Sequence, residues 1–182
     1  TIDNLNSKYL PDLNDEKKLR YQDNLKTILK QIKQIENLVN EFSDFARMPK
    51  PHFKNNDLLK VLDENIELLK KIDSTINFKV NNKIGKKVTI NFDNEQFNRL
   101  FFNLIKNSIE SIQEKVKKTN KSLKNIDIEI NQRRDYIIVN LNDTGEGFKN
   151  KKTKDIIKPY YTTKEKGTGL GLSIVDKIIN DH

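Results

Sequence analysis

Apolar residues recur at alternating steps of three and four between residues 17 and 48. They are Leu25, Ile28, Ile32, Ile35, Val39 and Phe42. This spacing predicts one long helix with a coiled-coil seam, and the seam is narrow enough to need other helices to cover it. Pro49 and Pro51 predict the end of the helix, because proline lacks an N–H donor and disfavours helical geometry in the residue before it. Residues 49–56 are then expected to be a linker.

A second helix is expected before this one. Ile2, Leu5 and Tyr9 have helical spacing, and the segment from Pro11 to Asp15 favours a turn. Residues 1–48 are therefore predicted to form a helical hairpin. Since the two helices of an antiparallel hairpin should have similar lengths, the hairpin is expected to begin upstream of residue 1.

The pattern after the linker changes between helical and strand periods. Helices are predicted for residues 57–72, 93–116 and 169–180, and strands for residues 74–80, 87–92, 125–132 and 136–142, with turns at 81–86 and 133–135. Asp93 is the expected N-cap of the middle helix, with Gln96 three residues later. This order predicts an α+β fold, a two-layer α/β sandwich whose helices pack on one face of a mixed, largely antiparallel sheet.

Three polar motifs follow one another in this part of the chain. Asn103, Asn107 and Glu110 share one side of the helix at 93–116, which is either a solvated face or a source of amide oxygens for Mg²⁺. The segment 143–148 follows a strand. It is either a tight turn that ends the strand, or a motif whose aspartate and glycines bind a flat base. The segment 167–172 precedes a helix, as a hinge or as backbone N–H groups that bind an anion.

Composition narrows the possible chemistry. The chain has no cysteine, which excludes disulfides, thiolate catalysis and zinc sites built on cysteine. Its net charge is +8. Residues 1–48 are balanced, and lysines gather at residues 149–166, beside the glycine motifs. This cluster indicates either an anion-binding loop or a general compositional bias. No aromatic stacking platform accompanies it, so nucleic acid is not an expected partner.

From about Phe53 onward the chain resembles the ATP-binding catalytic domain of sensor histidine kinases, in the superfamily shared with gyrase, Hsp90 and MutL ATPases. Residues 103–108 resemble the N box of that family, 143–147 the G1 box, 159–164 the F box and 167–172 the G2 box. The resemblance implies ATP and Mg²⁺ as cofactors. It also implies a partial dimerisation and phosphotransfer hairpin at 1–48, a linker at 49–56, and a catalytic domain at 57–182, truncated at its C-terminal end, with an ATP lid at about 149–166.

The resemblance also implies roles for single residues. Asn107 is expected to ligate Mg²⁺, Asp143 to bind the adenine amino group, and Gly145 and Gly147 to let the lid approach the nucleotide. The other expected nucleotide-binding residues are Asn103, Thr163, Lys164, Gly167, Thr168, Gly169, Leu170, Gly171 and Leu172.

Two positions of the same helix differ from parts of that superfamily. Asn103 stands where its ATPases carry a glutamate general base, so phosphoryl transfer is favoured over hydrolysis. Glu110 stands where many relatives have a basic residue, and a direct contact with phosphate is not expected.

The segment 42–49 resembles a helix end of nitrogen-regulation type sensor kinases. Their phosphoacceptor histidine would lie upstream of residue 1, so no catalytic residue is expected in the chain and the fragment alone should not autophosphorylate. The implied activity is transfer of the ATP γ-phosphoryl group to that histidine and then to a response-regulator aspartate. The alternatives are a non-catalytic module that docks a response regulator, and an anti-sigma type serine kinase without a dimerising hairpin.

The implied partners are a second copy of the chain, bound through the hairpin, and a response-regulator receiver domain. Membrane contact is expected only through segments absent from the chain, which would make it the cytoplasmic portion of an inner-membrane bacterial sensor.

Overall fold

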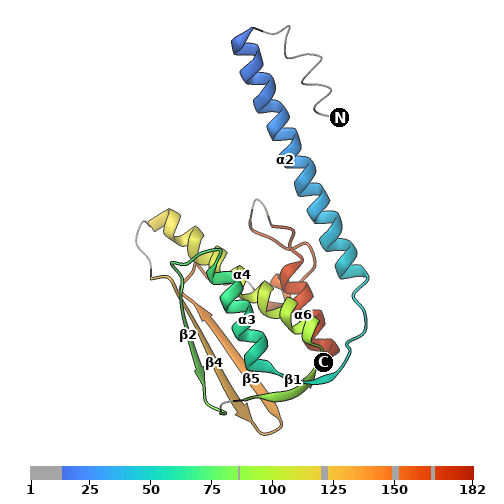
Figure 1. Cartoon of the computed structure of the whole chain (residues 1–182), viewed down its shortest axis with the longest axis vertical. Coiled ribbons are helices and arrows are strands. Elements are labelled where there is room, and N and C mark those ends of the chain that lie inside the picture. Colours follow the sequence, from blue (N-terminus) through green and yellow to red (C-terminus); the bar gives the residue numbers. More distant parts are fainter. Residues whose placement is uncertain (1–13, 86, 120–122, 149–151, 165–166) are drawn as a thin grey trace. The chain divides into compact units, whose positions relative to one another are not determined.

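The computed structural model describes residues 14–85, 87–119, 123–148, 152–164 and 167–182. The chain divides into two compact units, Thr1–Arg47 and Met48–His182. In the first unit, helix α2 spans Asp15–Ala46 (Figure 1), which confirms the long predicted helix. It begins at Asn14, whose side chain accepts a 3.0 Å hydrogen bond from the backbone N–H of Lys17. The shorter helix predicted around residues 2–9 lies outside the described residues.

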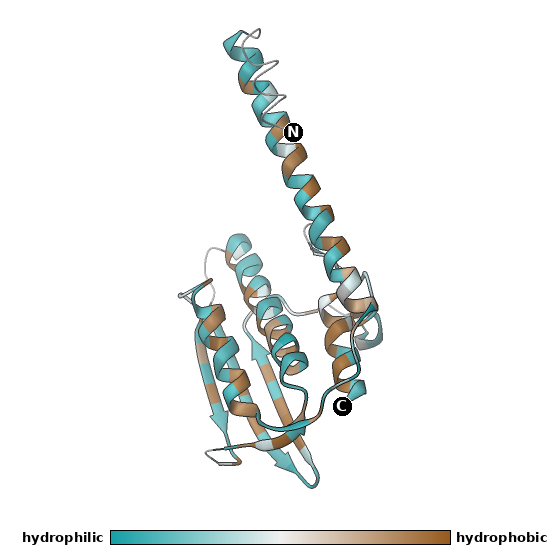
Figure 2. Cartoon of the chain, turned by 45° about the vertical axis from the view of Figure 1, so that its right-hand side comes forward, coloured by the Kyte–Doolittle hydropathy of each residue, from teal (hydrophilic) through white to brown (hydrophobic). Residues whose placement is uncertain are grey.

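Helix α2 keeps its apolar seam accessible. Figure 2 shows hydrophobic positions recurring along the whole helix. Six of them are between 44% and 65% exposed: Leu19, Ile28, Ile32, Ile35, Val39 and Phe42. A stripe of this kind is stable in water only when other helices cover it.

The second unit is a two-layer α+β sandwich, as the sequence predicts. Its elements in chain order are β1 (Lys54–Asp57), α3 (Leu58–Lys70), β2 (Asn77–Asn82), β3 (Thr89–Phe92), α4 (Asn94–Thr119), β4 (Asn125–Arg133), β5 (Tyr136–Asp143), α5 (Thr153–Ile156) and α6 (Gly171–Asp181). One sheet has the order β2-β4-β5, with β2 parallel and β5 antiparallel to β4, and β1 pairs with β3 antiparallel. Helices α3 and α4 lie over one face of the larger sheet (Figure 1).

The core forms between the central strand and the helices. Ile126, Ile128 and Ile130 alternate along β4 and are at most 1% exposed. The helices contribute Leu62, Leu69, Ile105, Ile112 and Ile178, all at most 1% exposed. Each such side chain stabilises the fold by about 1.5–3 kcal/mol relative to an exposed position. No helix in the described ranges is long and apolar enough to cross a membrane.

The structure differs from the sequence-based expectation at several boundaries. Residues 54–56 of the expected linker belong to β1, and the strand expected from residue 74 begins at Asn77. Asp73 causes the second shift, because its Oδ1 atom accepts from the backbone N–H of Thr75 at 3.0 Å and fixes a turn. The last helix begins at Gly171 instead of residue 169, and the short helix α5 was not predicted.

The first part of the expected linker is hydrogen-bonded to the rest of the second unit. The Gln96 side chain donates from Nε2 to the carbonyl oxygen of Pro49 at 3.0 Å, and the backbone N–H of His52 donates to Oδ2 of Asp93 at 2.6 Å. Asp93 caps α4 as predicted, since its Oδ1 atom accepts from the backbone N–H of Gln96 at 3.0 Å. Its own backbone N–H is satisfied by Nε2 of His182 at 3.1 Å, so the Gln96 side chain does not complete a capping box.

Candidate functional site

The site is built on one polar face of helix α4. Asn103, Asn107, Ser111 and Lys115 follow one another at steps of four, which places their side chains on the same side of the helix. All four are half-buried. At 1.5 Å per residue the row is about 18 Å long. Each motif singled out in the sequence contacts a different part of this row.

The last glycine motif contacts the first part of the row. A Cβ atom added to Gly171 would lie 3.1 Å from Oδ1 of Asn103, which is a tight contact, and 3.6 Å from Nδ2 of Asn107. The Asn103 amide donates from Nδ2 to the Arg99 carbonyl at 2.8 Å, which leaves Oδ1 on the side of Gly171. The N-terminus of α6 therefore lies against the two asparagine side chains.

The same N-terminus offers free backbone donors. No side chain caps α6, and its first helical hydrogen bond is the one from the N–H of Ile174 to the carbonyl of Leu170, at 2.9 Å. The N–H groups of Gly171, Leu172 and Ser173, in the first turn of the helix, and the positive end of the helix dipole favour an anion at this point. Leu170 is fully buried, and its backbone N–H donates to Oγ1 of Thr168 at 3.4 Å.

Gly169 holds this segment against the one before it. Its φ of +73° is a left-handed conformation, and an added Cβ atom would lie 2.5 Å from the carbonyl carbon of Tyr160. A Cβ atom on Gly167 would collide with Oγ1 of Thr162. Residues 167–169 therefore pack closely against residues 160–162, with Gly169 against the Tyr160 backbone and Gly167 against the Thr162 side chain. Thr163, also predicted in the site, is exposed and forms no hydrogen bond with the described residues.

The aspartate motif lies at the other part of the row. Asp143 ends β5, and its Oδ1 atom accepts from the backbone N–H of Gly145 at 2.8 Å. No described residue donates to Oδ2, and Asp143 as a whole is exposed. The loop is fixed to α4, since the N–H of Glu146 donates to Oγ of Ser111 at 3.0 Å and Nζ of Lys115 donates to the carbonyl of Thr144 at 2.7 Å.

Glycine is needed at two points of this loop for different reasons. A Cβ atom on Gly145 would collide with the Ser111 side chain. A Cβ atom added to Gly147 would meet nothing within 4 Å, but its φ of +66° is a left-handed conformation that favours glycine. The anchors Ser111 and Lys115 were missed in the sequence. Their signal was present, because both continue the i+4 spacing that begins at Asn103.

The middle of the row is occupied by a lysine from the end of the predicted lid. Nζ of Lys164 donates to Oδ1 of Asn107 at 3.3 Å and forms an ion pair with Glu110. The Asn107 amide oxygen of the polar row and the neighbouring Glu110 carboxylate therefore both contact the Lys164 ammonium. Of the other lysines predicted to gather here, Lys149, Lys151 and Lys166 lie outside the described residues.

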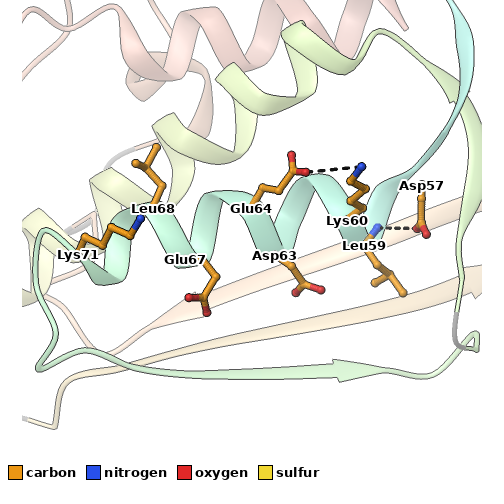
Figure 3. A pocket seen from close by; sticks show the side chains of 8 residues that line it. All are labelled: Asp57, Leu59, Lys60, Asp63, Glu64, Glu67, Leu68 and Lys71. Atoms are coloured by element: carbon orange, nitrogen blue, oxygen red, sulfur yellow. Dashed lines mark hydrogen bonds and ion pairs between the residues drawn. The ribbon is translucent and has the colours of Figure 1, made fainter.

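A shallow pocket elsewhere on the unit has different chemistry. It lies along the outer side of α3 (Figure 3), and four of its eight lining residues are acidic: Asp57, Asp63, Glu64 and Glu67. Burial, together with the charges of Asp57 and Glu67, raises the pKa of Asp63. A surface of this charge repels phosphate groups, so it is not the counterpart of the polar row on α4.

The polar row and the segments that contact it carry groups that can bind a cation, an anion and a hydrogen-bond donor. Asn107 offers an oxygen of the kind that Mg²⁺ prefers, and Lys164 shows that a cation is accommodated beside it. The uncapped N-terminus of α6 offers donors for phosphate, and the free oxygen of Asp143 offers an acceptor for an amino group.

Comparison with known proteins identifies the family of the chain. Residues 92–182 match the family model described as histidine kinase-, DNA gyrase B-, and HSP90-like ATPase. A putative NtrY-like sensor histidine kinase of Rickettsia bellii is 31% identical over 96% of the chain, and sporulation kinase C of Bacillus subtilis is 33% identical over 85% of it. The chain spans only 27% and 35% of the length of these two relatives.

Solved structures give the same fold. The catalytic domain of the histidine kinase ThkA matches with a TM-score of 0.60 at 25% identity, over 71% of this chain and 81% of that one. Full-length ShkA in complex with AMPPNP matches with a TM-score of 0.66 at 19% identity, over 88% of this chain and 34% of that one.

Proposed function

Because the chain belongs to the histidine kinase-, DNA gyrase B- and HSP90-like ATPase family, we propose that it is the catalytic, ATP-binding part of a sensor histidine kinase. In the whole protein it transfers the ATP γ-phosphoryl group to a histidine upstream of residue 1, from which a response-regulator aspartate receives it. One observation carries this proposal: the aspartate loop and the glycine-rich start of α6 both contact the face of α4 that carries the two asparagines.

In this proposal the parts of the nucleotide bind to the polar row and to the two segments that contact it. The adenine amino group donates to the free oxygen of Asp143, and the phosphates lie at the N-terminus of α6, where backbone N–H groups from Thr168 to Gly171 donate to them. Asn107 is the protein ligand of Mg²⁺, which neutralises charge on the transferring phosphoryl group. Leu172 and Thr163 border this site.

The chain's own groups favour transfer to another residue over hydrolysis. Asn103 has an amide where an ATPase needs a general base, and its Nδ2 atom is held by the Arg99 carbonyl. An amide cannot take a proton from water. The γ-phosphoryl group is therefore transferred to an acceptor residue on another segment. The lid restricts the entry of water.

The first unit supplies dimerisation in this proposal. The exposed seam of α2 needs partner helices, and a second copy of the hairpin completes a four-helix bundle. The receiver domain of a response regulator binds the assembled protein. The chain is then the cytoplasmic portion of an inner-membrane sensor.

The carrying observation can be tested through the base. In Asp143→Asn the side-chain oxygen stays with the N–H of Gly145, so the new NH₂ group faces the adenine amino group, and two donors oppose each other. Calorimetry with Mg²⁺ measures the binding of a non-hydrolysable ATP analogue to the full chain. The affinity of Asp143→Asn should be at least about tenfold lower than that of the unchanged chain, a loss of about 1.4 kcal/mol. Inosine triphosphate, whose 6-oxo group accepts a hydrogen bond, should lose less or gain.

Asp127→Asn is the matched control, because Asp127 lies on the exposed face of the sheet, away from α4. It should leave both affinities unchanged. Absence of binding by the unchanged chain, or equal binding by Asp143→Asn, would contradict the proposal.

Phosphoryl transfer needs a separate test, because the acceptor histidine is upstream. Mixing the chain with a fragment of the whole protein that carries this histidine, together with Mg·ATP, should give an acid-labile phosphoprotein. If the chain binds ATP but no acid-labile phosphoprotein forms, the chain is a nucleotide-regulated docking module.

A further inference from the structure

Lys164 contacts two oxygens that lie one helical turn apart on α4. Asn107 and Glu110 are three residues apart, which places their side chains side by side. Nζ of Lys164 donates to Oδ1 of Asn107 at 3.3 Å and pairs with Oε2 of Glu110. The Lys164 side chain is 26% exposed and the Glu110 side chain 35%, so the contact is partly shielded from water.

The position of this contact is as informative as its chemistry. Asn107 also lies beside Gly171, at the start of α6, where free N–H groups favour an anion. A Glu110 carboxylate without a counter-charge, three residues from Asn107 on α4, would weaken that preference, because like charges repel. The Lys164 ammonium neutralises the charge of the Glu110 carboxylate and also donates a hydrogen bond to the Asn107 oxygen.

We infer that Asn107 and Glu110 form a cation-binding pair, and that the Lys164 ammonium occupies this pair in the nucleotide-free protein and gives it up to a divalent cation. The inference rests on the proposed function only where it concerns ATP. An amide oxygen and a carboxylate are both ligands of hard cations, and a lysine ammonium offers three donors and no acceptor. Lys164 is thus a positioning residue that acts through Glu110.

The first test uses the metal alone and no nucleotide. Mn²⁺ broadens NMR signals near its site, so it can be titrated into the nitrogen-15-labelled chain while the amides of Asn107 and Glu110 are followed. In Lys164→Met the competing ammonium is gone, and Mn²⁺ should broaden these signals at a concentration at least about fivefold lower than in the unchanged chain. Lys164→Met combined with Glu110→Gln should lose this gain.

Lys177→Met is the control for removing one lysine from an ion pair on the same unit, since Lys177 pairs with Asp181 at 2.9 Å on α6. It should leave the Mn²⁺ titration unchanged. Equal broadening in Lys164→Met and the unchanged chain would overturn the inference, and so would a gain that survives loss of the Glu110 carboxylate.

The second test separates this role from direct binding of phosphate by Lys164. Without metal, in EDTA, Lys164→Met should bind an ATP analogue about tenfold more weakly, because the Glu110 charge is uncovered, and Glu110→Gln in the same chain should restore most of the affinity. Saturating Mg²⁺ should shrink the loss to about threefold or less, since the cation takes the place of the ammonium.

An equal loss with and without Mg²⁺, not relieved by Glu110→Gln, would mean that Lys164 acts directly on phosphate, and the inference would be wrong. Lys164→Arg keeps the charge and should resemble the unchanged chain in EDTA. If the unchanged chain binds no ATP analogue, the proposed function fails, and the Mn²⁺ titration alone decides the inference.

Discussion

The backbone N–H of His52 donates a 2.6 Å hydrogen bond to the carboxylate of Asp93, which lies 41 positions later in the chain. The same carboxylate caps α4, the helix that carries the polar row, through the N–H of Gln96. The segment around His52 is therefore attached to the N-cap residue of the proposed nucleotide-binding helix. The ring of His182, at the end of α6, accepts from the backbone N–H of Asp93 and packs against Phe53 at 5.0 Å between ring centroids.

Removing the Asp93 carboxylate should destabilise the second unit. Asp93→Ala takes an acceptor from the backbone N–H groups of His52 and Gln96 together, and loss of a helix cap costs about 1–2 kcal/mol. Urea unfolding of the full chain, followed by the circular dichroism of the helices, measures the change. Asp93→Asn is the comparison, because asparagine caps helices nearly as well and should cost less. Equal midpoints for Asp93→Ala and the unchanged chain would show that the clamp contributes nothing.

The same carboxylate predicts a pH dependence with a definite sign. Burial alone would raise the pKa of Asp93, but the backbone N–H groups of Gln96, His52 and Glu95, with the nearby His182, hold it below the ordinary value of 3.8. A lowered pKa stabilises the folded state above the unfolded pKa, and this contribution is lost as the pH falls through the folded pKa.

The free-energy difference between the unchanged chain and Asp93→Asn should therefore be constant near neutral pH and should narrow below about pH 5. Urea titrations at several pH values measure it. A difference that grows on acidification has the opposite sign and would contradict the assignment.

Two glycine substitutions separate backbone strain from collision. Gly147→Ala introduces only the strain of a left-handed alanine, about 1 kcal/mol, since nothing lies within 4 Å of the added Cβ. Gly169→Ala adds a collision with the Tyr160 backbone. Gly169→Ala should therefore weaken ATP-analogue binding in calorimetry by clearly more than Gly147→Ala. Similar losses would mean that the approach of Gly169 to Tyr160 does not shape the site.

Lys115 should matter for nucleotide affinity although it lies outside the motifs. Its ammonium donates to the Thr144 and Gly145 carbonyls at 2.7 and 3.2 Å, and it fixes the loop that carries Asp143. Lys115→Met should lower ATP-analogue affinity several-fold, because a loop that must be ordered on binding reduces affinity. Lys117→Met, two residues away on an exposed position of α4, is the control. An equal effect of both substitutions would indicate a general loss of positive charge.

The sequence predicted most of the fold because its periods are strong. The isoleucines of β4 alternate, and the apolar residues of α4 recur at helical spacing, so both elements were located to within a few residues. Strand β1 was missed, since its four residues Lys54–Asp57 are polar and form a strand only by pairing with β3. Local pattern carries no information on such a partner.

The candidate site divides in the same way. The glycines and asparagines could be found, because their spacing is local. The contact of Lys164 with Glu110 could not, since it joins residues 54 positions apart through the packing of the segment after α5. The role of His182 was missed for the same reason, as its partner Asp93 lies 89 positions away.

The central claim is that one face of α4 binds the nucleotide, and amide chemical-shift mapping of the full nitrogen-15-labelled chain with a non-hydrolysable Mg·ATP analogue tests it most directly. The account predicts the largest shifts at Asn103, Asn107, Gly145 and Gly171, and none at the α3 pocket around Asp63 and Glu67. The account would be contradicted if the shifts centred on the α3 pocket. It would also be contradicted if the analogue bound while the signals of these four residues stayed unchanged.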